Sequence, residues 1–144
     1  MPVRQRRASL SLLAVAGATG ALLSAQPAAT TWSGVYTSAQ ASDGELVVLD
    51  RCAGCHQPDL SGGEDAPALA GAQFAAKWDG RGLGVLFSLI RRTMPMDAPG
   101  SLSAAESAAV IAHLLRQNGF PAGTAPLPSE AESLNAIRFS AHQP

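Results

Sequence analysis

Aromatic side chains are scarce in this sequence. Its 144 residues include two tryptophans, one tyrosine and four phenylalanines, whereas glycine and proline occur 14 and 10 times. A small domain needs large apolar side chains to bury enough surface, so a core made from these alone would be thin. We therefore expect something other than side chains to fill part of the interior.

Strand patterns and internal repeats are also absent. No stretch alternates apolar and polar residues as half-buried strands do. The chain is 47% apolar and long enough for one small domain, and nothing in it marks a second core. We therefore expect a single all-α domain.

Two segments show the apolar spacing of helices. Leu46, Leu49 and Ala53 are spaced like one side of a helix over 41–55. A second helix is predicted over 82–92, with its inward stripe at Leu83, Leu86, Phe87 and Ile90. The first of these helices would deliver the cysteines at its end.

A third helix is predicted from its end signals. Ser103 and Glu106 can form a capping box at its start, and Gly119 lies where a left-handed residue would end it. The stretches 57–71 and 94–100 are rich in glycine and proline, which favours loops.

The one long apolar run lies at the N-terminus. Three arginines precede small residues and leucines over 8–25, a pattern typical of a signal peptide. We predict that residues 1–29 are removed on export to the periplasm, although 39–41 is a second possible cleavage site. A retained membrane anchor is the alternative, but the run is near the lower length limit for a membrane span.

Basic residues do not exceed acidic ones. The leader holds three of the ten basic residues and none of the eleven acidic ones, so the processed chain is negatively charged. This argues against nucleic acid or anionic lipid as a partner, because both select for basic surfaces. We expect no membrane span after processing.

Cysteine is limited to Cys52 and Cys55, so no disulfide can join distant parts of the chain. With His56 they form C-x-x-C-H, the attachment motif of c-type haem. Residues three apart on a helical turn face the same way, so both thiols can bond to one edge of the ring. A thioredoxin-like dithiol is one alternative, but its fold needs strands. A structural zinc site is another, and it would lack a fourth ligand.

A second iron ligand is expected from methionine. A soft thioether is the typical partner of histidine in electron carriers, and Met94 follows the motif at a suitable distance. Met96 is its rival, because residues two apart in an extended segment face the same side. The spacing leaves both open, and a methionine beside a helix can also be simple core filler.

Several short runs accompany the haem motif. They are WSGVYT at 32–37, QA at 40–41, DLSGG at 59–63, PAL at 67–69, TMP at 93–95, PGSLS at 99–103 and NGFPAG at 118–123. With these runs the chain resembles the class I c-type cytochromes, particularly those paired with periplasmic quinoprotein dehydrogenases. The resemblance covers roughly residues 32 to 123.

The resemblance implies a small class I cytochrome c fold, with three main helices and long loops around one covalently bound haem c. The cytochrome c domain is expected at 30–123. Residues 124–144 would be an Ala/Pro-rich C-terminal tail, extended on the surface or partly mobile.

The resemblance also implies roles for individual residues. The methionine before the first proline, Met94, would be the distal iron ligand, and His56 the proximal one. The carbonyl of Pro67 would accept the proton on the other ring nitrogen of His56. Trp78 and Arg81 would reach the haem propionates; ordinary packing and a solvated charge are the alternatives for these two.

The chain departs from this family at one helix contact. Where the first and last helices usually press aromatic rings together, it has Val48 and His113. We expect a thinner contact there, and a domain that depends more than usual on its covalent haem.

The implied function is one-electron transfer rather than enzymatic catalysis. The donor would be a periplasmic dehydrogenase, possibly a quinoprotein, and the acceptor another cytochrome or a terminal oxidase. One alternative is a dedicated cytochrome subunit of a dehydrogenase complex, docked through the tail or through residues 32–36. A second alternative is a haem enzyme or gas sensor in which the methionine is displaced.

Overall fold

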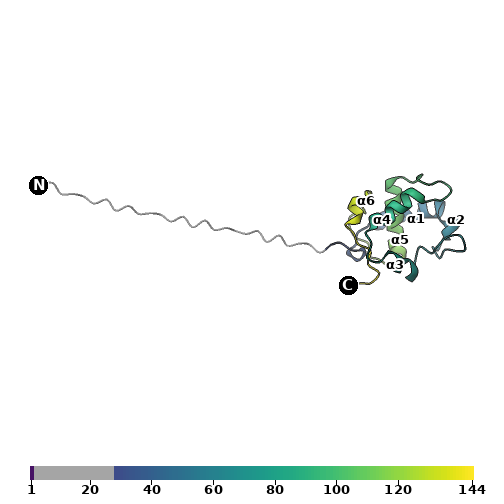
Figure 1. The fold of residues 1–144 in the computed structure, drawn as a ribbon, viewed down its shortest axis with the longest axis horizontal. Coiled ribbons are helices and arrows are strands. Elements are labelled where there is room, and N and C mark those ends of the chain that lie inside the picture. Colours follow the sequence, from purple (N-terminus) through teal and green to yellow (C-terminus); the bar gives the residue numbers. More distant parts are fainter. Residues whose placement is uncertain (2–27) are drawn as a thin grey trace.

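The computed structural model describes residue 1 and residues 28–144. Within these residues it contains helices and no strands, in agreement with the predicted all-α class (Figure 1). The elements are η1 (Thr31–Ser33), α1 (Ser38–Arg51), α2 (Ala53–His56), α3 (Ala72–Trp78), α4 (Leu83–Thr93), α5 (Ala104–Gln117) and α6 (Ala131–Asn135). None of the described helices is long and apolar enough to cross a membrane. The predicted signal peptide falls almost entirely outside the described residues.

The first and last long helices, α1 and α5, cross closely at small residues. A Cβ built on Gly44 would lie 1.9 Å from the carbonyl oxygen of Ala109, so the two backbones nearly touch. Ala41 and Val48 are fully buried on the same side of α1. The contact therefore rests on close backbone approach rather than on aromatic rings.

The side of α1 that faces α5 includes Val48, the residue expected at this helix contact. Leu46 and Leu49 are 69% and 51% exposed, whereas Ala41, Gly44 and Val48 face α5. The two leucines whose spacing indicated the helix therefore lie on its outer side. Close crossing of helices selects instead for the side with the smallest side chains.

The helices α4 and α5 are confirmed. The predicted stripe of α4 is buried in full: Leu83, Leu86, Phe87 and Ile90. At the start of α5, Ser103 and Glu106 form the capping box, with bonds of 3.1 and 2.7 Å. Gly119 has φ +80°, as expected just beyond the end of the helix. With α1, these make up the three main helices.

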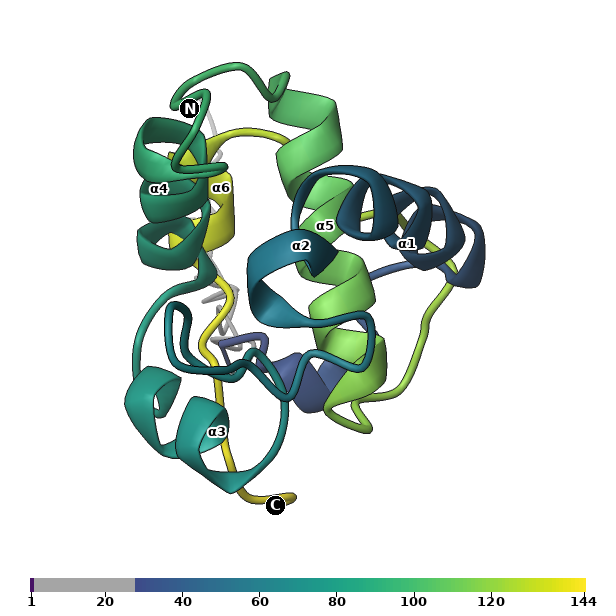
Figure 2. The same ribbon diagram turned by 90° about the vertical axis from the view of Figure 1, so that its right-hand side faces the viewer.

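The C-terminal segment is not a surface tail. Its helix α6 packs on α4, and the two helices lie side by side (Figure 2). Its apolar residues are buried: Leu127, Leu134, Ile137 and Phe139. The Ala, Pro and Ser between them hid this pattern, because the buried residues follow no single helical or strand period. The folded part of the chain thus extends well beyond residue 123.

The segment before α1 also belongs to the core. The indole of Trp32 donates to the Ser140 carbonyl at 2.9 Å, and its ring packs edge-on against Phe120 at 4.8 Å. The hydroxyl of Tyr36 donates to the Phe120 carbonyl at 2.7 Å. Neither this segment nor the C-terminal one is free to act as a docking arm.

Candidate functional site

The cysteine motif lies where α1 ends and α2 begins. Cys52 is the residue between the two helices, and its N–H donates to the Val48 carbonyl at 2.9 Å. The next turn, α2, carries Cys55 and ends at His56. Neither cysteine is in a disulfide; Cys52 is half-buried and Cys55 is exposed. Both thiols are thus free to bond to a cofactor.

His56 is buried and held by a hydrogen bond. Its Nδ1 lies 2.8 Å from the carbonyl oxygen of Pro67, the contact that the resemblance implied. Since a carbonyl can only accept, Nδ1 carries the proton in this contact. The lone pair of Nε2 is then available to bind a metal, in the tautomer that iron requires.

The thiols do not suit the dithiol alternative. Burial raises the pKa of the Cys52 thiol, and the nearby charge of Arg51 opposes this only in part. Redox-active dithiols instead lower the pKa of their first cysteine. The zinc alternative also lacks support. The described residues contain no group of three or more His, Cys, Asp or Glu side chains placed to hold a metal ion.

The two methionines occupy different environments. Met94 follows α4, where its N–H donates to the Ile90 carbonyl at 3.0 Å, and its side chain packs against the core. Met96 is 76% exposed. A ligand on the inner side of the domain is therefore better provided by Met94.

Trp78 and Arg81 are brought together at the end of α3. Trp78 is buried, and the guanidinium carbon of Arg81 lies 5.8 Å from its ring centroid. The ammonium of Lys77 lies 5.7 Å from the same ring. This places two positive charges beside one aromatic ring, an arrangement able to receive carboxylates.

The loop between α2 and α3 contains contacts that the sequence motifs alone did not assign. The side chain of Asn118 bonds to the backbone of Leu69 and Gly71, and Gly62 lies against the peptides on both sides of Pro67. Asn118 and Gly62 are in two of the runs that carry the resemblance. Their position in those runs was the available signal, but only the folded loop shows what they touch.

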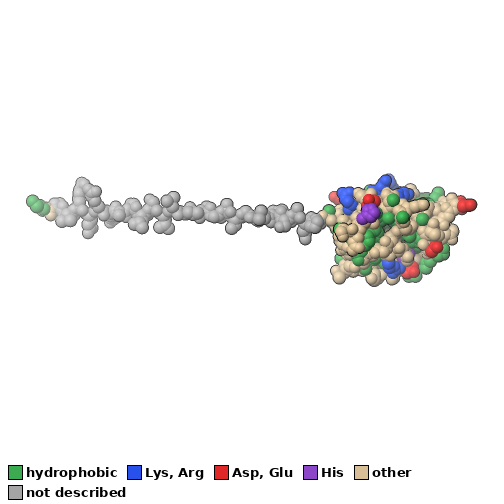
Figure 3. Space-filling model, turned by 90° about the horizontal axis from the view of Figure 1, so that it is seen from below, with side chains coloured by type: hydrophobic (Ala, Val, Ile, Leu, Met, Phe, Trp, Pro, Cys, Tyr) green, Lys and Arg blue, Asp and Glu red, His purple; other side chains and the backbone are tan. Residues whose placement is uncertain are grey.

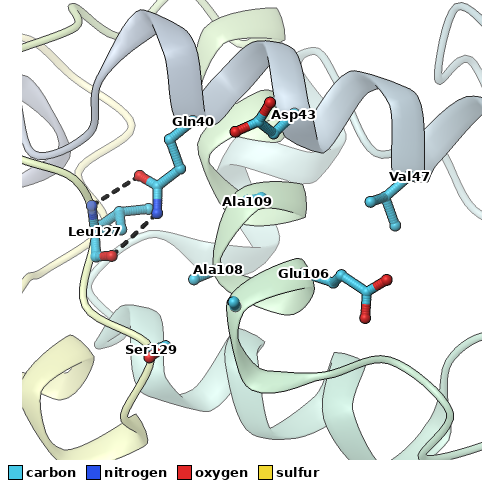
Figure 4. A pocket seen from close by; sticks show the side chains of 9 residues that line it. Gln40, Asp43, Val47, Glu106, Ala108, Ala109, Leu127 and Ser129 are labelled. Carbon is cyan, nitrogen blue, oxygen red and sulfur yellow. Dashed lines mark hydrogen bonds between the residues drawn. The ribbon is translucent and has the colours of Figure 1, made fainter.

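A separate groove of about 330 Å³ lies between α1 and α5 (Figure 4). Asp43, Val47 and Glu106 line it, and the Gln40 amide exchanges two hydrogen bonds with the Leu127 backbone, of 3.0 and 2.8 Å. None of the residues predicted for the site lines this groove.

These features describe an all-α domain with a c-type haem attachment site. The sequence model of the family described as cytochrome c matches residues 41–118, more than half of the chain. The chain belongs to the cytochrome c family. It is therefore an electron-transfer haem protein, and its cofactor is covalently bound haem c. The free thiols and the orientation of His56 fit this cofactor.

One solved structure resembles the fold, the sulfane dehydrogenase SoxCD from Paracoccus pantotrophus. The TM-score is 0.49 and the sequence identity 23%, with 68% of this chain and 52% of that chain covered. The chain thus spans about half the length of the solved chain. A comparison with curated proteins finds no significant match.

Proposed function

We propose that the chain is an exported carrier of single electrons in the periplasm. In this proposal haem c is bonded to Cys52 and Cys55, and its iron is held by His56 and Met94. The observation that carries it is the 2.8 Å bond from His56 Nδ1 to the Pro67 carbonyl, which leaves Nε2 as the ligand atom beside two free thiols.

Two protein ligands on the iron would favour electron transfer over ligand chemistry. When bound, the cofactor would supply reversible one-electron reduction of its iron. His56 and Met94 together would leave no free position for a substrate or gas. The residues of the chain then fix the ligands, shield the iron from water and present one edge of the cofactor to partners.

Exposed apolar side chains that are near the ligands in the sequence are the residues we propose for docking. Leu46 and Leu49 lie on the helix that leads into Cys52, and Met96 lies two residues after Met94. Small apolar patches suit the weak, short-lived contacts of redox proteins. On the face shown in Figure 3, acidic, basic and apolar side chains are intermixed, so it offers no broad patch of one charge.

The proposed donor is a periplasmic dehydrogenase, possibly a quinoprotein, and the proposed acceptor another cytochrome or a terminal oxidase. Both come from the class I resemblance. Purification from the periplasm separates a free carrier from a fixed subunit: a carrier elutes alone, whereas a subunit elutes with a dehydrogenase at constant stoichiometry.

A spectroelectrochemical titration of the exported protein tests the proposal. We expect a single transition that fits one electron, with a positive midpoint potential, because a methionine ligand and apolar surroundings favour the ferrous state. A strongly negative midpoint potential would contradict Met94 as a ligand. A haem spectrum that does not change with applied potential would contradict the carrier function.

A further inference from the structure

We infer that Asn118 is a positioning residue for the His56 ring, acting through the loop that carries Pro67. This inference rests on the proposed role of His56 as iron ligand. Asn118 lies at the end of α5, and through this loop it would fix the direction of the His56 imidazole at the end of α2.

Asn118 uses both of its side-chain donors and its acceptor oxygen. Its Nδ2 donates to the carbonyls of Leu69 at 3.1 Å and Leu114 at 2.8 Å, and its Oδ1 accepts from the N–H of Gly71 at 3.0 Å. Two carbonyls and one N–H fix the orientation of the amide, because only nitrogen can donate to the carbonyls. Asp and Ser cannot reproduce the set, since neither has two donors and an acceptor. The side chain thus ties the loop to the last turn of α5.

Backbone hydrogen bonds within the loop connect the part held by Asn118 to His56. The Leu69 N–H donates to the Leu60 carbonyl at 2.9 Å, and the Gly62 N–H donates to the His56 carbonyl at 2.9 Å. A Cβ built on Gly62 would lie 2.5 Å from the Ala68 nitrogen and 2.6 Å from the Pro67 carbonyl carbon. Only glycine permits this approach, at a φ of +73°. The backbone around Pro67 is therefore held from both sides.

Pro67 itself is exposed, so core packing does not fix its carbonyl. The hydrogen-bonded loop fixes this carbonyl, and Asn118 joins the end of that loop to α5. Loss of Asn118 should loosen the loop at Leu69 and Gly71 and lengthen the Pro67–His56 contact. A weaker bond to Nδ1 makes the imidazole a poorer electron donor to the iron. Poorer donation destabilises the ferric state, so the midpoint potential should rise.

Asn118→Ala and Asn118→Asp test this in the exported holoprotein. Asn118→Asp keeps an acceptor for the Gly71 N–H but loses both donors. We expect a higher midpoint potential in Asn118→Ala, whereas in Asn118→Asp the added negative charge favours the ferric state and opposes this rise. Exchange of the His56 Nδ1 proton with solvent, followed by NMR, should be at least tenfold faster in Asn118→Ala.

Gln40→Ala is the matched control. Its side chain also ties a loop to a helix, with two bonds to the Leu127 backbone (Figure 4), and these bonds do not involve the loop of Pro67. It should lower thermal stability without changing the potential or the Nδ1 proton exchange. If Asn118→Ala fails to mature, the Nδ1 proton exchange of Asn118→Asp decides the test, since that variant also loses both donors and its exchange should be faster than in the wild type.

Wild-type potential and proton exchange in the Asn118 variants would overturn the inference, as would equal shifts in Gln40→Ala. In either case the wild-type protein would still hold haem and accept one electron. Failure of the proposed function is distinguishable, because the wild-type protein itself would then show no one-electron transition.

Discussion

Met94 and Met96 lie two residues apart but differ in burial, which makes them a natural pair of variants. Met94→Ala should open a coordination position, so that carbon monoxide binds rapidly to the reduced protein and the midpoint potential falls. Met96→Ala should leave both properties unchanged, because its side chain is exposed. Absorbance during carbon monoxide titration measures the first effect. Rapid saturation of the wild-type protein would instead favour a gas sensor or a haem enzyme.

His113 is buried between α1 and α5 and should make stability depend on pH. Burial lowers the pKa of its imidazole, and the positive charge of Arg116 lowers it further. The negative charge of Glu45 and a hydrogen bond to the Ala41 backbone oppose this shift of the pKa. Arg116 Nη2 lies 3.1 Å from His113 Nδ1 and must donate, so the ring is neutral in the fold. The unfolded chain therefore binds the proton more readily than the folded one, and the free energy of unfolding falls as the pH drops below about 6.5.

His113→Gln should reduce this pH dependence. Unfolding by denaturant at about pH 7.5 and about pH 5 measures it, and the loss of stability on acidification should be smaller in the variant. His142→Gln is the control, since His142 is exposed. An equal loss in His113→Gln and wild type would show that other groups cause the dependence.

The crossing of α1 and α5 depends on the absence of a side chain at Gly44. In Gly44→Ala the added methyl group would meet the Ala109 carbonyl, and we expect a loss of about 1–3 kcal/mol in the free energy of unfolding. Asp43→Ala is a control on the same helix, because Asp43 is exposed. Denaturant unfolding of both variants measures the difference. Equal stabilities would mean that the helices do not cross as closely as described.

The helices differed in how well the sequence predicted them. The α4 stripe and the α5 capping box are local signals, and both were correct because periodic spacing and side-chain caps act within a few residues. For α1 the sequence predicted the helix and the place of Val48 at the contact with α5, but not the close crossing at Gly44, which has no side chain to give a periodic signal. No helix was predicted at α3 or α6, because each is about two turns or less and is stabilised by contacts far along the chain.

Residues from both ends of the described chain close one aromatic cluster. Phe139 packs against Phe120 at 5.1 Å and Phe74 at 6.0 Å, and Trp32 joins through Phe120. Phe139→Ala should lower the free energy of unfolding by about 3–5 kcal/mol. Glu132→Ala, exposed in the same segment, should change it by less than about 0.5 kcal/mol. A loss in Phe139→Ala as small as that control would restore the interpretation of this segment as a surface tail.

The site was easier to predict than the domain that holds it. Cys52, Cys55 and His56 form a contiguous motif, so their chemistry could be inferred without the fold. The contacts of Asn118 with the loop of Pro67 could not be inferred from the sequence, because they join positions almost 50 residues apart. The extent of the domain was missed for the same reason: the segment after residue 123 is ordered by packing on α4 rather than by its own pattern.

The central claim is that haem is covalently bonded to Cys52 and Cys55. Intact and peptide mass spectrometry of the exported protein tests it most directly. We predict the mass of the processed chain plus one haem, with the increment on the peptide that contains residues 52–56. An exported product with the mass of the bare polypeptide would contradict the account.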